Sequence, residues 1–170
     1  MKKIFIIISF LFIAGFQNSF AQLKIGYVDS DAIMTKLPDA LDAQQKIDAF
    51  VQEWQEEIDK MQREWKSKYE DYEKRKLIMS DERRADTEKE LVALEKQITD
   101  YRQKKFGVNG ELFTKQDELM KPVQNRIFNA IQDVAKENEY DYVFDRSGDI
   151  VFLYTKEEYD VTNLVLEKLQ

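Results

Sequence analysis

The sequence of 170 residues contains no cysteine and no histidine, and it has only five glycines and two prolines. Without cysteine and histidine, a disulfide framework, a thiol nucleophile, a histidine-based triad and a zinc or iron–sulfur site with the usual ligands are excluded. The scarcity of glycine and proline, with 35% charged residues, is typical of long helices joined by few turns. We therefore expect no metal and no cofactor, and an ordinary globular enzyme is disfavoured.

The first 21 residues are predicted to be a secretory signal peptide. Two lysines precede an apolar run from Ile4 to Phe16, and a small-x-small pattern ends at Ala21. A transmembrane helix is the alternative, but the run is shorter than the roughly 20 residues that cross a bilayer. We expect cleavage near Ala21 and a mature chain in the periplasm.

The net charge argues against nonspecific binding of nucleic acid. The whole sequence has a formal charge of −7, and removal of the two lysines of the predicted signal peptide leaves 24 basic and 33 acidic residues, or −9. Nonspecific binding to nucleic acid needs clustered lysine and arginine to displace counterions. We therefore expect no nucleic-acid partner.

Both ends of the mature chain are predicted to form a small body. Residues 24–29 alternate in polarity and predict a strand, and Ser30 and Asp31 are good N-caps for a short helix that ends at Pro38. Near the C-terminus, residues 140–145 and 150–154 predict two strands joined as a hairpin, and residues 160–169 predict a closing helix. Three short strands with two helices have little core, so we expect the body to oligomerise.

The middle of the chain is predicted to be a helical hairpin. From residue 39 onward, no proline occurs before 122 and no glycine before 107, and apolar residues recur at spacings of three and four. Ser80 is a helix cap, and reflection of one arm on the other about residues 79 and 80 places Trp54 opposite Lys105 and Val51 opposite Val108. The two sets of seam residues are Ile47, Val51, Trp54, Ile58, Met61 and Trp65, and then Leu91, Leu94, Ile98 and Tyr101.

Three positions in the returning arm predict an interruption. Gly107 and Gly110 fall inside the helical pattern, and Pro122 should kink the helix beyond them. We interpret these residues as a hinge, and a loop that ends one helix and starts another is the alternative. The predicted organisation is a signal peptide (1–21), a first part of the body (22–38), a hairpin arm (39–138) with its tip near 78–82, and a second part of the body (139–170).

The charges are divided along the predicted arm. Residues 39–59 carry a net charge of −6, and residues 74–84 at the tip carry +3. A solvated helix end explains this pattern, and contact with acidic clients or with an anionic membrane surface is the functional alternative. The basic residues of the tip are Lys74, Arg75, Lys76, Arg83 and Arg84.

Other chemistry finds little support in the sequence. The aromatic residues Trp54, Trp65, Tyr69 and Tyr72 are interpreted as seam residues, with apolar surface for a client as the alternative. Acidic clusters have lysine or arginine three or four residues away, which favours salt-bridged helix faces over metal or acid–base sites. Neither G-x-S-x-G nor a P-loop motif occurs, so nothing supports an enzyme.

Taken in order, the signal peptide, the strand 24–30, the charged hairpin, the strand Tyr142–Asp145 and the helix opening at Asp160 resemble the Skp family of periplasmic chaperones, also called the OmpH family. This resemblance implies a homotrimer whose β-rich body holds three helical arms around a cavity for unfolded outer-membrane proteins, without ATP. Skp proteins are often strongly basic, whereas this chain is acidic. The oligomer body would include Ile25, Tyr27, Val28, Val143, Phe144, Val151 and Leu153.

The predicted fold class is therefore α+β and mostly α, with a long antiparallel coiled-coil hairpin on a small three-stranded body. The first functional hypothesis is an ATP-independent holdase for unfolded outer-membrane β-barrel proteins. A structural spacer or envelope adaptor that docks a folded partner is the alternative, and a carboxylate-based helical enzyme is a much weaker third.

Overall fold

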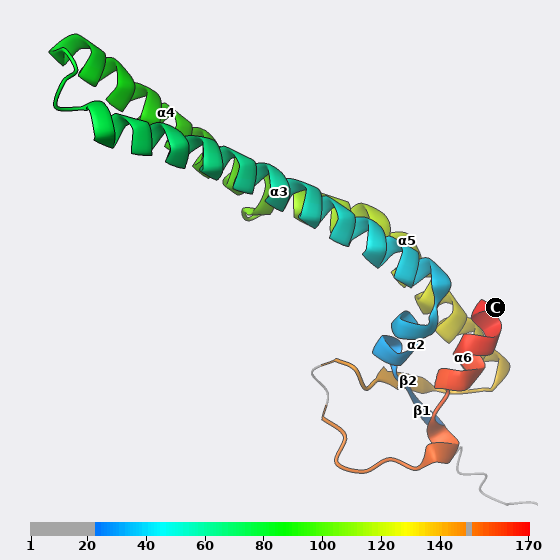
Figure 1. Ribbon diagram of the computed structural model, residues 1–170. Coiled ribbons are helices and arrows are strands. Elements are labelled where there is room, and N and C mark those ends of the chain that lie inside the picture. Colours follow the sequence, from blue (N-terminus) through cyan, green and yellow to red (C-terminus); the bar gives the residue numbers. More distant parts are fainter. Residues whose placement is uncertain (1–22, 149–150) are drawn as a thin grey trace, which may run out of the picture.

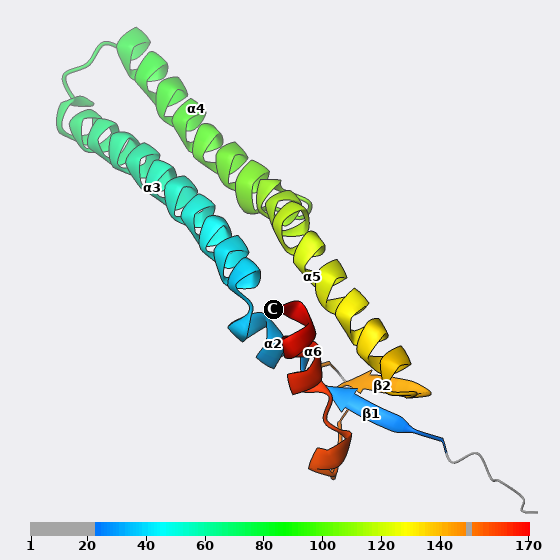
Figure 2. The same cartoon turned by 90° about the vertical axis from the view of Figure 1, so that its right-hand side faces the viewer.

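A computed structural model describes residues 23–148 and 151–170, and it shows one long helical arm projecting from a small body (Figures 1 and 2). The predicted signal peptide and Ile150 lie outside the described residues. Both described ends of the chain lie in the body, and the tip of the arm lies at the opposite end of the molecule. The elements are β1 (Ile25–Val28), α2 (Ser30–Lys36), α3 (Pro38–Arg75), α4 (Asp81–Phe106), α5 (Glu111–Glu137), β2 (Tyr142–Asp145), the 3-10 helix η1 (Glu157–Tyr159) and α6 (Thr162–Leu169).

The sheet of the body has two strands, which pair in parallel. Ile25 lies opposite Tyr142, and the register continues to the end of both strands. The predicted hairpin between β2 and residues 150–154 is wrong, because residues 151–154 form no strand in this chain. Alternation of polarity identifies a strand but not its partner, and here β2 pairs with the first strand of the chain. The three-stranded body is therefore corrected to two strands within the described residues.

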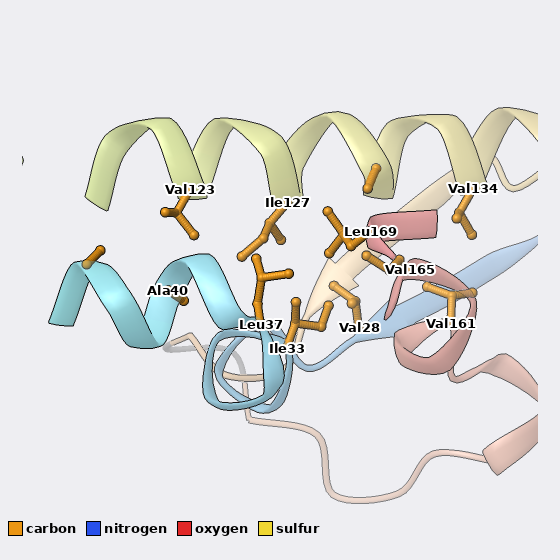
Figure 3. Close-up of a cluster of buried hydrophobic side chains, with 12 residues drawn as sticks. Val28, Ile33, Leu37, Ala40, Val123, Ile127, Val134, Val161, Val165 and Leu169 are labelled. Atoms are coloured by element: carbon orange, nitrogen blue, oxygen red, sulfur yellow. The ribbon is translucent and has the colours of Figure 1, made fainter. Parts of the chain in front are cut away.

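The core of the body joins residues from five elements, β1, α2, α3, α5 and α6 (Figure 3). Val28 at the end of β1, Ile33 on α2, Val161 and Val165 are at most 1% exposed. The buried apolar positions of α5 recur at spacings of three and four and face this cluster. The remaining members of the cluster are Leu37, Ala40, Ala43, Val123, Ile127, Ala130, Val134 and Leu169.

The arm is an antiparallel pair in which α3 packs against both α4 and α5. Pro38 occupies the first turn of α3, where its missing N–H is tolerated. The side chain of Ser80 accepts a hydrogen bond from the backbone N–H of Arg83 and starts α4, which confirms the predicted cap and turn. The Lys105 ammonium lies 4.6 Å from the ring centroid of Trp54, so the predicted opposition of these two residues is also confirmed.

The returning side of the arm is broken between Phe106 and Glu111. The interruption predicted at Gly107 and Gly110 is therefore confirmed, in the form of a loop that ends one helix and starts another. Val108 is 90% exposed on this loop, so its predicted place in the seam opposite Val51 is wrong. Helix α5 continues through Pro122 without a break.

Candidate functional site

The inner face of the arm buries two of its aromatic residues and partly covers others. Trp54 is 4% exposed and Tyr72 is 9% exposed. The indole N–H of Trp65 donates a hydrogen bond of 3.2 Å to the backbone carbonyl of Leu91 on α4. Tyr69 is 41% exposed and stacks on Trp65 at a centroid distance of 5.1 Å. The interpretation as seam residues is confirmed for Trp54 and Tyr72, whereas Tyr69 lies at the surface.

Polar pairs replace the apolar seam near the tip. Lys68 forms an ion pair with Glu90 across the two helices, and the hydroxyl of Tyr72 donates a hydrogen bond to Glu88. The hydrogen bond to Glu88 raises the pKa of Tyr72, so this hydroxyl remains a donor. Leu91 is the one fully buried residue among the residues of α4. The distal half of the arm therefore holds together through few apolar contacts, and such regions open locally at low free-energy cost.

The five predicted basic residues of the tip do lie together around the turn between α3 and α4 (Figure 1). Three of them form ion pairs with a carboxylate of their own helix, which reduces the charge that the tip presents. Sequence reasoning missed Leu77 and Ile78 at the same turn, which are 90% and 85% exposed. The three pairs are Arg75 with Asp71 at 3.0 Å, Lys76 with Glu73 at 2.8 Å, and Arg84 with Asp81 at 3.5 Å.

The body exposes a second, larger apolar surface. Val151 and Leu153 are 81% and 96% exposed, and Ile25 and Phe144 are also exposed, as residues available to a partner should be. Tyr27 and Val28 are buried inside this chain, so within the predicted oligomer body they contribute to the packing of the single chain, and Val143 packs partly against the core. The sequence interpretation missed four members of this surface, namely Leu23, Tyr142, Phe152 and Tyr154.

A groove follows the side of β1 away from β2. Its volume is about 700 Å³. Among the described residues, the one β-bridge on this side of β1 joins Tyr27 to Asp160, just before α6. The groove is therefore an apolar channel beside a largely open strand edge, and it is lined by Leu23, Ile25, Phe152, Tyr154 and Tyr159, among others.

Asp145 ties the end of β2 to the start of α2. Its carboxylate accepts hydrogen bonds from the backbone N–H and hydroxyl groups of both Ser30 and Ser147. Burial alone would raise the pKa of Asp145, but the hydrogen bonds from the two serines outweigh it and lower the pKa. The carboxylate therefore favours the folded state when it is ionised.

We expect Asp145→Asn to lower the free energy of unfolding by about 1–2 kcal/mol at neutral pH, because the amide cannot accept all four hydrogen bonds. The carboxylate's stabilisation is complete above the ordinary pKa of an aspartate and disappears as the pH falls through the lowered pKa. The free energies of unfolding of the parent and of Asp145→Asn should therefore become equal in acid. Urea unfolding at several pH values measures this, with Asp31→Asn as a control at an exposed position of α2. An equal loss of unfolding free energy at all pH values would contradict a stabilising role of the ionised Asp145 carboxylate.

Metal binding and membrane crossing can be considered for the described ranges, 23–148 and 151–170. No group of three or more acidic side chains there is arranged to hold a metal ion. Among the helices of those same ranges, none has the length and apolar character to cross a membrane. Nine ion pairs of the arm join an acidic residue to a lysine or arginine three or four positions away, as the charge pattern predicted, for example Asp42 with Lys46 at 2.6 Å.

The small body with one long, broken helical arm defines the class of an arm-bearing α+β protein. The chain belongs to the family described as outer membrane protein (OmpH-like), whose model matches residues 24–169. This confirms the resemblance drawn from the sequence, and the OmpH-like family is not an enzyme family. No curated protein matches the sequence.

A solved structure shares the fold. It is the crystal structure of a putative outer membrane chaperone (OmpH-like) from Caulobacter crescentus CB15, with a TM-score of 0.71 and 12% sequence identity. The match covers 86% of this chain and 83% of that one. At this identity the likeness establishes a common architecture of body and arm.

Proposed function

We propose that the protein is an ATP-independent periplasmic holdase that keeps unfolded outer-membrane β-barrel proteins from aggregating before they are inserted. Membership of the OmpH-like family supports a chaperone, and a solved structure with the same fold is described as a putative outer membrane chaperone. The observation that carries the proposal is the arm. Helix α3 has 38 residues, about 57 Å at 1.5 Å per residue, far more than the core of the body uses.

The root of the arm offers apolar side chains that a client could contact. Leu41 is 47% exposed, and Phe113 and Phe128 are each 59% exposed. Ile47 and Met120 line a shallow groove beside Phe113. Aggregation-prone strands of an unfolded client have apolar faces, and several weak contacts along the arms would cover them with useful avidity.

We further propose that three chains assemble through their bodies and arrange the arms around a shared cavity. The support is the exposed apolar surface of the body, defined by Ile25, Phe144, Val151 and Leu153 and their neighbours. Contiguous apolar surfaces of this kind mark interaction sites. The small core of a single body gives a further physical reason for assembly.

The holdase proposal predicts that the protein suppresses light scattering by several unrelated urea-denatured β-barrel proteins on dilution, at about one trimer per client and without nucleotide. The matched comparison is the same assay with one folded β-barrel protein in detergent, which should not bind. Binding of a single folded partner with no effect on denatured clients would instead favour the structural spacer or adaptor. No binding to either would overturn both.

We propose that the basic tip contacts acidic clients or an anionic membrane surface. Reversal of Lys74, Arg75, Arg83 and Arg84 to glutamate should weaken client binding several-fold at low salt, with a smaller effect at high salt because ions screen exposed charges. Binding is measured by fluorescence anisotropy, and sedimentation with anionic vesicles measures the membrane contact. Unchanged binding in both assays at low salt would contradict the proposal. A control with the same change in net charge reverses Lys60, Lys66, Lys89 and Lys96, which are exposed along the arm.

A further inference from the structure

The break in the returning side of the arm lies beside an unbroken helix. Residues 107–110 connect α4 to α5, while α3 passes the same level without interruption and packs against both. Any change of direction between α4 and α5 must therefore be accommodated along α3. Contacts that join all three helices at this level control whether such a change occurs.

Lys105 makes such contacts. Its side chain is 15% exposed, and its ammonium lies 4.6 Å from the ring centroid of Trp54 on α3 and 5.6 Å from that of Tyr101 on α4. The same ammonium forms an ion pair and hydrogen bond with Glu111, the first residue of α5. Phe106 meets Trp54 edge to face at 5.8 Å. One cation thus links α3, α4 and α5 across the break.

Helix polarity strengthens the pair. Lys105 lies in the last turn of α4 and Glu111 in the first turn of α5, so each charge lies at the end of its helix that favours its sign. An exposed ion pair contributes little, but a cation that has lost most of its water depends on its counter-ion. Lys105 has only a small exposed fraction, whereas the neighbouring Lys104, 3.5 Å from Glu111, has a side chain that is 72% exposed.

The glycines of the loop allow the close return that the pair requires. Gly107 and Gly110 have ordinary negative φ values of −68° and −70°. A Cβ atom on Gly107 would overlap the carbonyl oxygen of Gln103, and one on Gly110 would lie 2.9 Å from the carbonyl oxygens of Gly107 and Lys104. The left-handed residue of the loop is Asn109, with φ 59°. These two glycines are therefore needed because backbone carbonyl groups lie close to their Cα atoms, and not because they adopt unusual φ values.

We propose that the Lys105–Glu111 pair, seated on Trp54, is a latch that holds α5 at one angle to α4. The latch must open before the root and the distal part of the arm change their relative direction. Opening moves Glu111 away and leaves the Lys105 cation against the indole without its counter-ion, so the closed state predominates. The hinge predicted at Gly107, Gly110 and Pro122 then acts only from the open state.

Spin-label distance measurements test the latch directly. The chain has no cysteine, so labels attach only at Gln97→Cys on α4 and Asn129→Cys on α5, two exposed positions on either side of the break. Labelled chains are diluted into unlabelled ones so that only distances within one chain contribute. The parent should give one narrow distance distribution, and Lys105→Met and Glu111→Gln should each broaden it.

Matched controls keep the test decisive. Lys104→Met removes the exposed neighbouring lysine, and Glu118→Gln removes a carboxylate of α5 that pairs with a surface lysine at 2.8 Å. Both should retain the narrow distribution. If circular dichroism shows that Lys105→Met loses helix, Glu111→Gln decides, because its side chain leaves the packing on Trp54 intact. Distributions as narrow in the latch variants as in the controls would overturn the latch, as would a broad one in the parent. No client is present, so the outcome is independent of the holdase proposal.

Discussion

Replacing Trp54 by alanine is expected to lower the free energy of unfolding by about 3–5 kcal/mol, the cost typical of deleting a buried aromatic side chain. The indole is 4% exposed and contacts Phe50 and Phe106 at centroid distances of 5.7 and 5.8 Å. The variant also leaves Lys105 without the ring on which it lies. Because Leu91 is the one buried residue of α4, this helix offers few other apolar contacts that could offset the loss.

Urea unfolding followed by circular dichroism at one fixed chain concentration measures this loss, since the stability of an oligomer depends on concentration. Tyr69→Ala is the matched control, because it removes an aromatic residue of the same helix that is 41% exposed. We expect the control to lose less than about 1 kcal/mol. Equal losses in the two variants would contradict the role of Trp54 as the main contact of the arm.

The double variant Val151→Glu and Leu153→Glu is expected to abolish association of the proposed trimer. These side chains are 81% and 96% exposed in the single chain, so the substitutions leave its fold unchanged, but they would place unpaired charges inside an apolar interface. Sedimentation velocity should show monomers of the variant where the parent sediments as an oligomer, with the same helix content.

Leu77→Glu and Ile78→Glu form the control for this experiment. They introduce the same charges at two apolar residues of similar exposure, at the opposite end of the molecule (Figure 1), and should leave the oligomer intact. Dissociation of both double variants would indicate a general effect of charge. A parent protein that stays monomeric at micromolar concentration would remove the trimer altogether.

The arm could be predicted from the sequence because its signals are local. Spacings of three and four set the helices, a single hydroxyl at Ser80 caps the second one, and reflection about this turn places Lys105 on Trp54 as the structure has it. The same reflection was wrong for Val108. This residue lies on the loop between α4 and α5, where the helical spacing no longer applies.

The body was harder to predict because its contacts join residues far apart in the sequence. Residues 151–154 are all apolar, and such a run does not identify the strand with which it would pair. In the single chain these four residues form no strand. Tyr27 and Val28 were predicted as part of the oligomer body, and the structure adds that both side chains are buried within the single chain. Leu77 and Ile78 were missed as exposed apolar surface, because exposure depends on what the neighbouring helices cover.

The parallel pairing of β1 and β2 has a consequence for the order in which the molecule folds. The amide of Lys24 donates to the carboxylate of Asp141, a contact that spans 117 residues. Contacts of such long range form slowly in an unfolded chain, because the entropy of closing the loop must be overcome first. A chain that emerges N-terminus first has no partner for β1 until almost all of it has followed.

The arm shortens this search. Once the turn at Ser80 forms, α3 and the returning helices can zip together from the tip toward the root, and each added pair brings the two ends of the chain closer. When Val123 and Ile127 reach Leu37 and Ala40, the segments that form β1, β2 and α6 remain to be joined to them. The same long hairpin that dominates the finished molecule thus also brings the two ends of its chain together, where the body forms.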